Sequence, residues 1–207
     1  MIRKPRVQAK QSFSRNTSVA FNRKNMRAYV LDSELECDHM RLEVFNLEDD
    51  EDFEMQPEPL IHLCNDKLVN YTPDSEKSVK IGRNTVREIK YAKDANTEEN
   101  KEKFKFLEEQ YDAIGKNFEV LTEHDIRKGH RPENLAQLYP SLIHSSPINE
   151  FKALTANITP KKKTLAQMHR IADRRGIPRV FVKRSIAHKL FRCDLTQLWS
   201  SLVLTWD

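Results

Sequence analysis

The stretch 71–91, YTPDSEKSVKIGRNTVREIKY, is expected to organise the rest of the chain. Near its end, Glu88, Ile89 and Lys90 belong to a run with β-branched residues, which favours a strand. Side chains in a strand alternate between the two faces, so Glu88 and Lys90 share one face while Ile89 points to the other. The sequence therefore predicts a strand that presents a carboxylate and an ammonium group side by side.

A second carboxylate is expected next to this strand. Pro73 rigidifies the chain just before Asp74, and residues 82–84, GRN, indicate a turn between two strands. Thirteen residues separate Asp74 from Glu88, and a hairpin with this turn would bring the two together. Two hard carboxylates presented in this way suit Mg²⁺, which prefers oxygen ligands and keeps water positions open for a substrate phosphate.

This spacing is typical of metal-dependent nucleases. A bound metal lowers the pKa of a water and stabilises the charge on a phosphodiester under attack. Lys90 would orient that water or neutralise phosphate. The same pattern also occurs in surface hairpins whose alternating Glu and Lys form a solvated face, so these residues alone leave both interpretations open.

The charges of the chain are segregated into blocks. Its 207 residues, 38% hydrophobic and 32% charged, suffice for one domain of ordinary size and a small second one. Residues 1–27 carry eight Lys or Arg and no acid, residues 32–58 carry twelve acids and one Arg, and residues 150–207 carry twelve Lys or Arg and four acids. This pattern indicates basic ends that contact a polyanion and an acidic middle that gathers cations.

The cysteines and the hydropathy favour a cytoplasmic location. Cys37, Cys64 and Cys193 show no paired metal-ligand spacing and are expected to be free thiols in a reducing compartment. There is no apolar run long enough to span a bilayer and no secretory signal at the N-terminus. We therefore expect no membrane partner.

Three parts are expected along the chain. Residues 1–27 form a basic, flexible arm that orders on a partner such as nucleic acid. Residues 28–146 form the main domain, and residues 147–207 form a small C-terminal domain. The candidate contact residues of the arm are Arg15, Arg23 and Lys24.

The main domain is predicted to be α/β, with a mixed sheet flanked by helices. A helix begins near Leu31 with Ser33 as its cap, and Glu36 is either a capping-box residue or a carboxylate held near a buried site. The other predicted elements are an acidic loop at 48–54, strands at 60–64 and 67–71, a helix at 97–114 and a strand at 118–121. A strand, a helix and a returning strand make a parallel crossover.

The C-terminal domain is predicted to be winged-helix-like. A helix opens at Thr159-Pro160, a second runs over 178–188, and residues 190–207 alternate enough to form a strand pair. A cluster of basic residues lies on these helices and would contact either DNA or a protein partner. The cluster comprises Arg174, Arg175, Arg179, Lys183 and Arg184.

With these residues in hand, the first two thirds of the chain resembles the TnsA-like endonucleases. These are the nuclease subunits of Tn-seven-like heteromeric transposases, in the restriction-endonuclease-like PD-(D/E)xK superfamily. The matching blocks, in the order of the family, are SELE at 33–36, FEMQP at 53–57, YTPD at 71–74, EIK at 88–90 and LTEHDI at 121–126. The C-terminal segment matches more loosely.

The resemblance implies a role for each matching residue. Glu36 corresponds to the helix carboxylate of the family's active site, Asp74 to the metal-bridging aspartate, and Glu88 to the carboxylate on the second strand. Lys90 corresponds to the catalytic lysine, and Gln56 assists the site. The implied cofactor is Mg²⁺, held by Asp74, Glu88 and Glu36, with Mn²⁺ expected to substitute.

The resemblance also implies a function and partners. In the family, this endonuclease cleaves the 5′ strand at each transposon end, while a DDE-type transposase cuts and joins the 3′ strands and an AAA+ ATPase regulates the assembly. One alternative is a stand-alone nuclease of the restriction or junction-resolving type. The other is a catalytically degenerate nuclease fold that serves the transposition complex as a DNA-binding scaffold.

The chain departs from the family pattern directly after YTPD. Where relatives continue into an apolar strand such as FLV, this chain has SEKS at 75–78. The departure weakens the predicted strand after Asp74 and leaves open a strand that begins at Val79. It also makes Glu76 a competing metal ligand.

Overall fold

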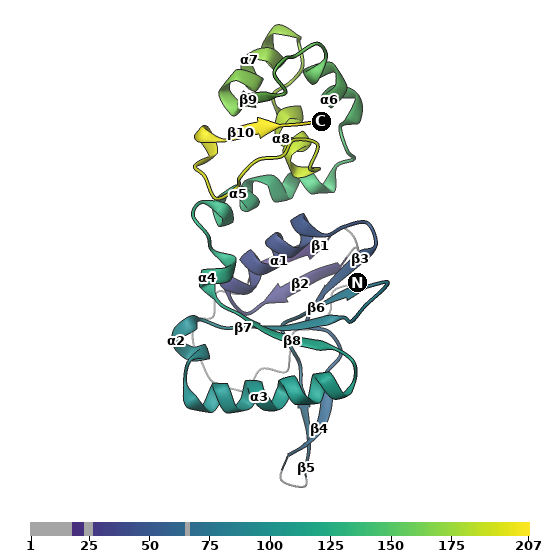
Figure 1. Cartoon of the computed structure of the whole chain (residues 1–207), viewed down its shortest axis with the longest axis vertical. Helices are drawn as coiled ribbons and strands as arrows, with labels where there is room; N and C mark the ends of the chain where they lie inside the picture. Colours follow the sequence, from purple (N-terminus) through teal and green to yellow (C-terminus); the bar gives the residue numbers. More distant parts are fainter. Residues whose placement is uncertain (1–17, 23–26, 65–66) are drawn as a thin grey trace. The chain divides into compact units, whose positions relative to one another are not determined.

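The computed structural model describes residues 18–22, 27–64 and 67–207 (Figure 1). The chain divides into two compact units, Met1–Ile126 and Arg127–Asp207. The boundary expected at 146–147 therefore lies earlier in the chain. The reason is that helix α5 (Arg131–Leu138) and the 3-10 helix η1 (Tyr139–Ile143) pack against α8 (Val180–Ala187) of the second unit.

The first unit is built on a mixed sheet of four strands. Its order is β3-β6-β7-β8, with antiparallel pairing throughout except for the parallel pair β7 and β8. The strands are β3 (Glu51–Met55), β6 (Ser75–Val79), β7 (Thr85–Ile89) and β8 (Asn117–Leu121). The predicted α/β class, the central hairpin and the parallel crossover through α3 (Glu98–Ala113) are confirmed.

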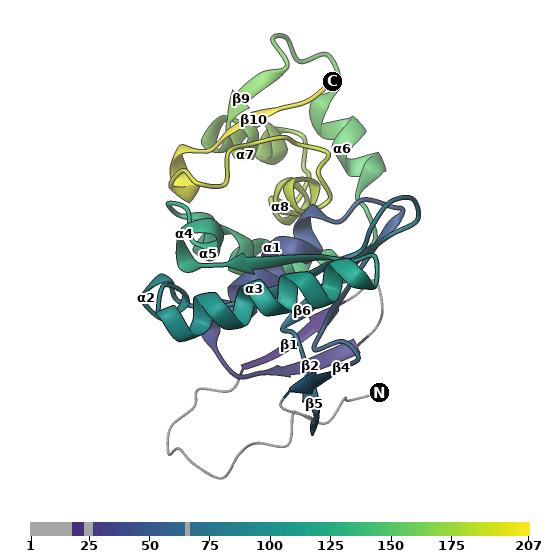
Figure 2. The same cartoon turned by 60° about the horizontal axis from the view of Figure 1, so that its bottom comes forward.

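Helices cover both faces of this sheet (Figures 1 and 2). Val86 of β7 packs against Leu107 and other apolar residues of α3 on one face. Ile89 of the same strand packs against Leu35 of α1 (Glu34–Asn46) on the other. The alternation of side chains along β7 thus assigns each residue of the strand to the α3 face or to the α1 face.

Two hairpins and two short helices complete this unit. The hairpins are β1 (Ser18–Asn22) with β2 (Arg27–Leu31), and β4 (Leu60–Cys64) with β5 (Lys67–Tyr71). The short helices are α2 (Ala92–Ala95), before α3, and α4 (Glu123–Ile126), after β8. The bounds predicted for β4 and β5 are confirmed.

Three predictions for this unit are wrong. The arm expected over 1–27 includes strand β1, while 1–17 and 23–26 lie outside the described residues. The helix expected from Leu31 begins at Glu34, because Leu31 ends β2, although Ser33 is the cap as predicted. The acidic loop at 48–54 contains strand β3, whose Phe53 is 1% exposed. Buried apolar positions thus outweigh its acidic composition.

Strand β6 begins at Ser75, immediately after Asp74, so the alternative start at Val79 is wrong. The charged side chains that follow are paired. Glu76 lies 2.7 Å from Lys116 Nζ, and Lys77 Nζ lies 2.6 Å from Glu51. Partners of opposite charge allow this polar segment to form an inner strand.

The turn between β6 and β7 is fixed by Asn84. Its Oδ1 accepts a hydrogen bond from the Val79 N–H at 3.3 Å, and its Nδ2 donates to Glu76 at 2.8 Å and to Ser78 at 3.2 Å. Gly82 in the same turn has φ of +113°, which side-chain-bearing residues rarely adopt. These features set the register in which Ser75 pairs with Arg87.

The second unit is mainly helical. Besides α5, η1 and α8, it contains α6 (Ile148–Thr155), β9 (Lys162–Thr164), α7 (Leu165–Arg174), η2 (Trp199–Ser201) and β10 (Val203–Thr205). β9 pairs with β10, and Arg192 bridges Thr205. Phe191 is buried in the core, with its ring centroid 5.0 Å from that of Phe151 and 5.5 Å from that of Trp206.

The structure differs from two predictions about the second unit. The helix expected from Thr159-Pro160 begins at Leu165, because Thr164 caps it in a capping box with Gln167. The expected strand pair in 190–207 is reduced to β10 and the single bridge at Arg192.

The structure also bears on the predictions about free cysteines and about membrane-spanning helices. Cys37 and Cys193 are free, and burial raises the pKa of both thiols, to about 11 for Cys193. The side chain of Cys64 lies outside the described residues. In the described ranges, every helix is too short or too polar to cross a bilayer.

His39 makes the stability of the first unit sensitive to acid. The imidazole is 0% exposed, and its Nε2 lies 2.9 Å from Ser75 Oγ. Burial, with a smaller contribution from the Arg87 charge, lowers its pKa from 6.5 to about 3. The unfolded chain therefore binds one more proton between these values. The free energy of unfolding is therefore not reduced by His39 above pH 6.5, and it falls as the pH drops below that value.

We expect His39→Gln to reduce the acid sensitivity of unfolding. From about pH 7.5 to about pH 5.5, the free energy of unfolding of the wild type should fall by roughly 1.4 kcal/mol more than that of the variant. Urea titrations followed by circular dichroism at both pH values measure this difference. Equal losses in the two proteins would contradict a neutral, buried His39.

Candidate active site

Asp74 and Glu88 lie side by side at one end of the β6-β7 hairpin. The Asp74 N–H donates to the Arg87 carbonyl at 3.0 Å, and Asp74 Oδ2 accepts from the Ile89 N–H at 2.7 Å. Ser75 pairs with Arg87, so the next pair in the antiparallel register is Asp74 with Glu88. Both carboxylates lie on the α3 face and are buried, with exposures of 7% and 5%. The predicted juxtaposition of these two residues is present.

Two further side chains contact Glu88. Lys90 Nζ lies 3.6 Å from Glu88 Oε1, and the Lys90 side chain is 36% exposed. The Lys90 N–H donates to the Leu121 carbonyl at 3.0 Å, which ties this position to the end of β8. The Tyr71 hydroxyl donates to Glu88 Oε2. Lys90 thus reaches both the buried carboxylate and the surface.

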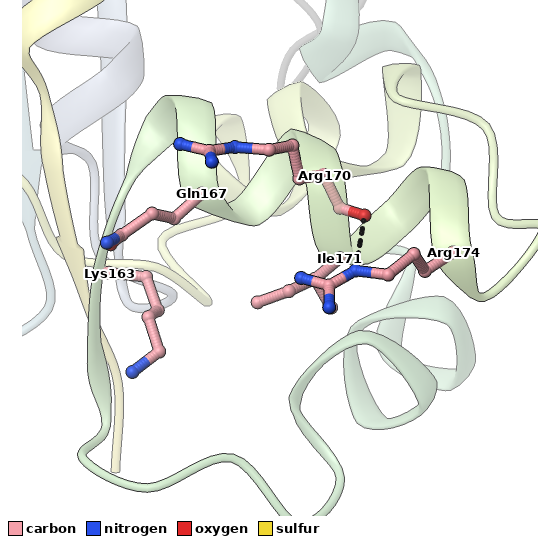
Figure 3. A pocket seen from close by; sticks show the side chains of 5 residues that line it. All are labelled: Lys163, Gln167, Arg170, Ile171 and Arg174. Atoms are coloured by element: carbon pink, nitrogen blue, oxygen red, sulfur yellow. Dashed lines mark hydrogen bonds between the residues drawn. The ribbon is translucent and has the colours of Figure 1, made fainter.

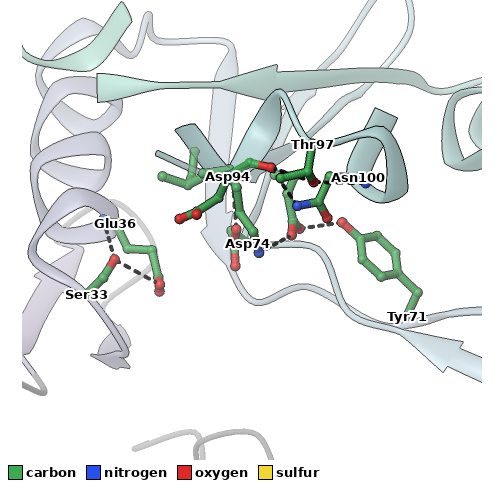
Figure 4. Close-up of polar contacts among 10 residues, drawn as sticks. Ser33, Glu36, Tyr71, Asp74, Asp94, Thr97 and Asn100 are labelled. Carbon is green, nitrogen blue, oxygen red and sulfur yellow. Dashed lines mark hydrogen bonds and ion pairs between the residues drawn. The ribbon is translucent and has the colours of Figure 1, made fainter. Parts of the chain in front are cut away.

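Tyr71 is the site residue to which the sequence assigned no role (Figure 4). Burial, and then the negative charge of Glu88 and the hydrogen bond to it, raise the pKa of Tyr71 far above its usual range. The phenol therefore stays protonated and holds one oxygen of Glu88. The available signal was its position in the YTPD block, three residues before Asp74.

Glu36 is not brought together with the other two carboxylates. Its Oε1 accepts from Ser33 Oγ at 3.1 Å, and its Oε2 accepts from the Asp32 N–H at 3.3 Å. Figure 4 shows Glu36 apart from Asp74. The physical reason is that α1 covers the face of the sheet opposite to that of Asp74 and Glu88. Across the described ranges, no group of three or more His, Cys, Asp or Glu is arranged to hold a metal.

Gln56 contributes through its backbone. It adopts a left-handed conformation with φ of +49°, and its N–H donates to the Asp74 carbonyl at 2.8 Å. Its side-chain Nε2 donates to the Val30 carbonyl at 3.4 Å. Gln56 therefore supports the chain at Asp74, and its amide group is used to tie β2 to this point.

Glu76 is engaged away from the two carboxylates. It forms the ion pair with Lys116 and accepts from Asn84, as described above. These partners compensate its charge within the hairpin. The metal ligands available on this face are therefore Asp74 and Glu88.

The basic cluster of the second unit separates into residues used by the fold and residues on the surface. Arg175 donates to the Ala153 and Ala156 carbonyls, and Arg179 forms a bidentate pair with Asp173 at 2.6 and 2.8 Å. The Arg184 guanidinium lies 5.3 Å from the Phe181 ring.

Of the other basic candidates, Arg174 is exposed on α7 and Lys183 is half-buried on α8. Arg15, Arg23 and Lys24 lie outside the described residues.

The donor set fits Mg²⁺ or Mn²⁺. Asp74 and Glu88 supply hard oxygen ligands, and one or two carboxylates suffice for Mg²⁺ when waters and substrate phosphate complete the coordination. Each carboxylate is oriented by a hydrogen bond, from the Ile89 N–H for Asp74 and from the Tyr71 hydroxyl for Glu88. Such supporting bonds maintain the geometry of a metal ligand.

Tyr71→Phe should weaken Mn²⁺ binding without unfolding the protein. The change removes the donor to Glu88 and keeps the ring, and the loss of such a supporting bond costs about tenfold to a hundredfold in metal affinity. Isothermal calorimetry measures the effect. Tyr91→Phe is the matched control, because Tyr91 is 38% exposed. An unchanged affinity in Tyr71→Phe would refute a positioning role.

No protein-family model matches the chain, and no curated protein gives a significant match. The function is therefore inferred from the residues and the geometry of the site.

Proposed function

We propose that the protein is a metal-dependent DNA endonuclease that hydrolyses a phosphodiester bond with Mg²⁺ held by Asp74 and Glu88. The observation that carries the proposal is the pairing of these buried carboxylates across the hairpin, with Lys90 Nζ 3.6 Å from Glu88. A structural ion pair would explain the proximity of Lys90 to Glu88. It would not explain a second buried carboxylate beside them.

The arrangement of elements supports the same proposal. Helix α1, the strands β3, β6 and β7, the crossover helix α3 and strand β8 follow one another in the chain around one mixed sheet. The resemblance described above implies this restriction-endonuclease-like order. Asp74 directly before β6 and Glu88 on β7, the two strands of the central hairpin, are the residues to which the resemblance assigns the metal.

Each residue has a distinct part in the proposed reaction. A bound Mg²⁺ supplies Lewis acidity for water activation and for charge on the phosphate. Asp74 and Glu88 provide its protein ligands, and Tyr71 holds Glu88 in place. Lys90, partly exposed, orients the attacking water or neutralises a phosphate oxygen. Ser33 caps α1, and the Glu36 carboxylate is held by Ser33 Oγ and the Asp32 N–H, so it is not assigned as a ligand in this proposal.

Within this class, we propose cleavage of the 5′ strand at transposon ends, in concert with a DDE-type transposase and an AAA+ ATPase. The support is the ordered set of blocks that resembles the TnsA-like endonucleases. The second unit would be the winged-helix-like domain of such a protein. The order α6, β9, α7, α8 and β10, with β9 paired to β10, supports this assignment.

A catalytically inactive scaffold is the second candidate. The observation that favours it is the separation of Glu36 from Asp74 and Glu88, which leaves two carboxylates at the site. Two ligands are sufficient for Mg²⁺ when substrate phosphate joins them, so the nuclease remains the better explanation.

Calorimetric titration of Mn²⁺ into the purified protein tests the proposed metal site. The wild type should bind the ion and Asp74→Ala should not, because the variant lacks one of the two ligands. Binding of equal strength by both proteins would place the metal elsewhere. If neither binds, the same titration with a DNA duplex present decides whether substrate phosphate completes the site, and failure there would reject the site.

A further inference from the structure

A cationic groove lies on the second unit, and none of its lining residues belongs to the candidate active site. It has a volume of about 260 Å³ and is lined by Lys163, Gln167, Arg170, Ile171 and Arg174 (Figure 3). The last four recur at helical spacing and therefore share one face of α7. Lys163 comes from β9, directly before the helix. Three positive charges and one amide surround one apolar side chain.

The charges of this groove are not compensated by acids. Within the described ranges, no ion pair includes Lys163, Arg170 or Arg174, and no acidic side chain lines the groove. The acid of α7, Asp173, is paired with Arg179. The groove therefore gathers three cations without an internal counter-charge.

The hydrogen bonds of the two arginines leave their terminal nitrogens available. Arg170 Nε donates to the Ala166 carbonyl at 3.4 Å, and Arg174 Nε donates to the Arg170 carbonyl at 3.3 Å. These bonds orient both guanidinium groups along the same helix. Two oriented guanidinium groups, one helical turn apart, suit successive anionic groups on an extended ligand.

We propose that this groove binds the phosphodiester backbone of duplex DNA. Guanidinium groups bind phosphate in bidentate fashion, Lys binds it as a point charge, and Gln amides donate to phosphate oxygens. The groove presents all three donor types. The choice of duplex DNA rests on the proposed nuclease function, whereas a polyanion site follows from the groove itself.

The proposal extends the DNA-contacting surface beyond the basic cluster predicted from the sequence. It adds Lys163, Gln167 and Arg170 to Arg174. It removes Arg175 and Arg179, whose guanidinium groups are used by the fold. The groove is not expected to recognise a base sequence, because contacts to the DNA backbone fix only the position and orientation of the protein.

The double variant Arg170→Gln with Arg174→Gln tests the groove. Binding of a fluorescein-labelled 30-base-pair duplex is followed by anisotropy in EDTA, so that cleavage plays no part. We expect affinity to fall by about tenfold or more, because two charge-assisted contacts are lost. The slope of log K against log salt should decrease by roughly two. The control is Lys128→Gln with Lys152→Gln, two exposed cations of the same unit that do not line the groove.

Gln167→Glu separates binding from folding. Its side chain accepts from the Thr164 N–H at 2.9 Å in the capping box, and glutamate serves equally well at that position. The variant should therefore keep or slightly raise the thermal midpoint, while the new carboxylate repels phosphate and weakens duplex binding. A stable variant with unchanged binding would overturn the proposal.

The remaining outcomes are also decisive. If the double variant binds duplex as the wild type does, the groove is not a DNA site. If duplex binding is unchanged but binding of labelled poly-glutamate is lost, the groove is a site for an acidic protein segment and the proposal is overturned. Failure of the nuclease proposal has a different signature, since Mn²⁺ binding and cleavage would be absent while groove-dependent duplex binding persisted.

Discussion

In the proposed transposition complex, Asp74→Ala should abolish 5′-strand cleavage at transposon ends, while the 3′ strands are still cut and joined by a DDE-type transposase. Loss of a metal ligand removes several kcal/mol of transition-state stabilisation, so the rate of 5′-strand cleavage should fall at least about a thousandfold. The measurement is a reaction with the complete set of subunits in Mg²⁺, on duplexes labelled separately at each 5′ end. Separate labels show which of the two strands is cut, whereas a plasmid assay does not distinguish them.

Two controls make this result specific to the metal site. Asp74→Asn removes the charge but keeps an acceptor for the Ile89 N–H, so it should lose cleavage with little change in stability. Asp112→Asn changes an exposed aspartate on α3 and should cleave normally. Cleavage of both strands by Asp74→Ala would exclude the proposed nuclease and favour the scaffold. Cleavage of DNA by the wild type without any partner would favour a stand-alone enzyme.

Phe191→Ala should cause the largest loss of stability in the second unit. Phe191 is 2% exposed and packs edge-on against the rings of Phe151 and Trp206. Replacing a buried aromatic residue by alanine costs about 3–5 kcal/mol. The only two tryptophans of the chain, Trp199 and Trp206, lie in this unit, so tryptophan fluorescence reports its unfolding alone.

Leu198→Ala is the matched control for this prediction. Leu198 belongs to the same unit but is 51% exposed, so its removal should change the free energy of unfolding by less than about 0.5 kcal/mol. Urea titrations of both variants, followed by fluorescence, give the comparison. Equal effects of the two substitutions would show that the packing of Phe191 does not stabilise this core.

Local signals in the sequence predicted the central hairpin and the crossover. Gly82 and Asn84 mark the turn, and alternation at 85–89 marks the strand. Thr97, where the helix was expected to begin, caps α3, and Phe104, Leu107 and Tyr111 of that helix are buried. Ile114, the expected last residue of the helix at 97–114, is 55% exposed because α3 ends at Ala113.

Elements that depend on distant partners were not predictable. The composition of β3 is acidic, and only its pairing with β6 and the burial of Phe53 make it a strand. The unit boundary likewise depends on α5 and η1 packing against α8, far along the chain. Both features arise from tertiary contacts that local propensity does not record.

The candidate site was predictable to the extent that it is local. Asp74, Glu88 and Lys90 lie on one hairpin, so their spacing was sufficient. Glu36 comes from a helix on the opposite face of the sheet, and Tyr71 comes from the separate β4-β5 hairpin. Their distances from the carboxylates depend on how these elements pack, which spacing alone does not give.

The Asn84 turn links a surface segment to the alignment of Asp74 with Glu88. Ile81, at its tip, is 94% exposed, and such loops ordinarily tolerate insertions. A slip of one residue between β6 and β7 would move Glu88 to the α1 face and separate it from Asp74. The Asn84 side chain forms hydrogen bonds to three positions of the hairpin and thereby opposes that slip. Changes in the length of this exposed turn would therefore disturb the pairing of the two carboxylates at the other end of the hairpin.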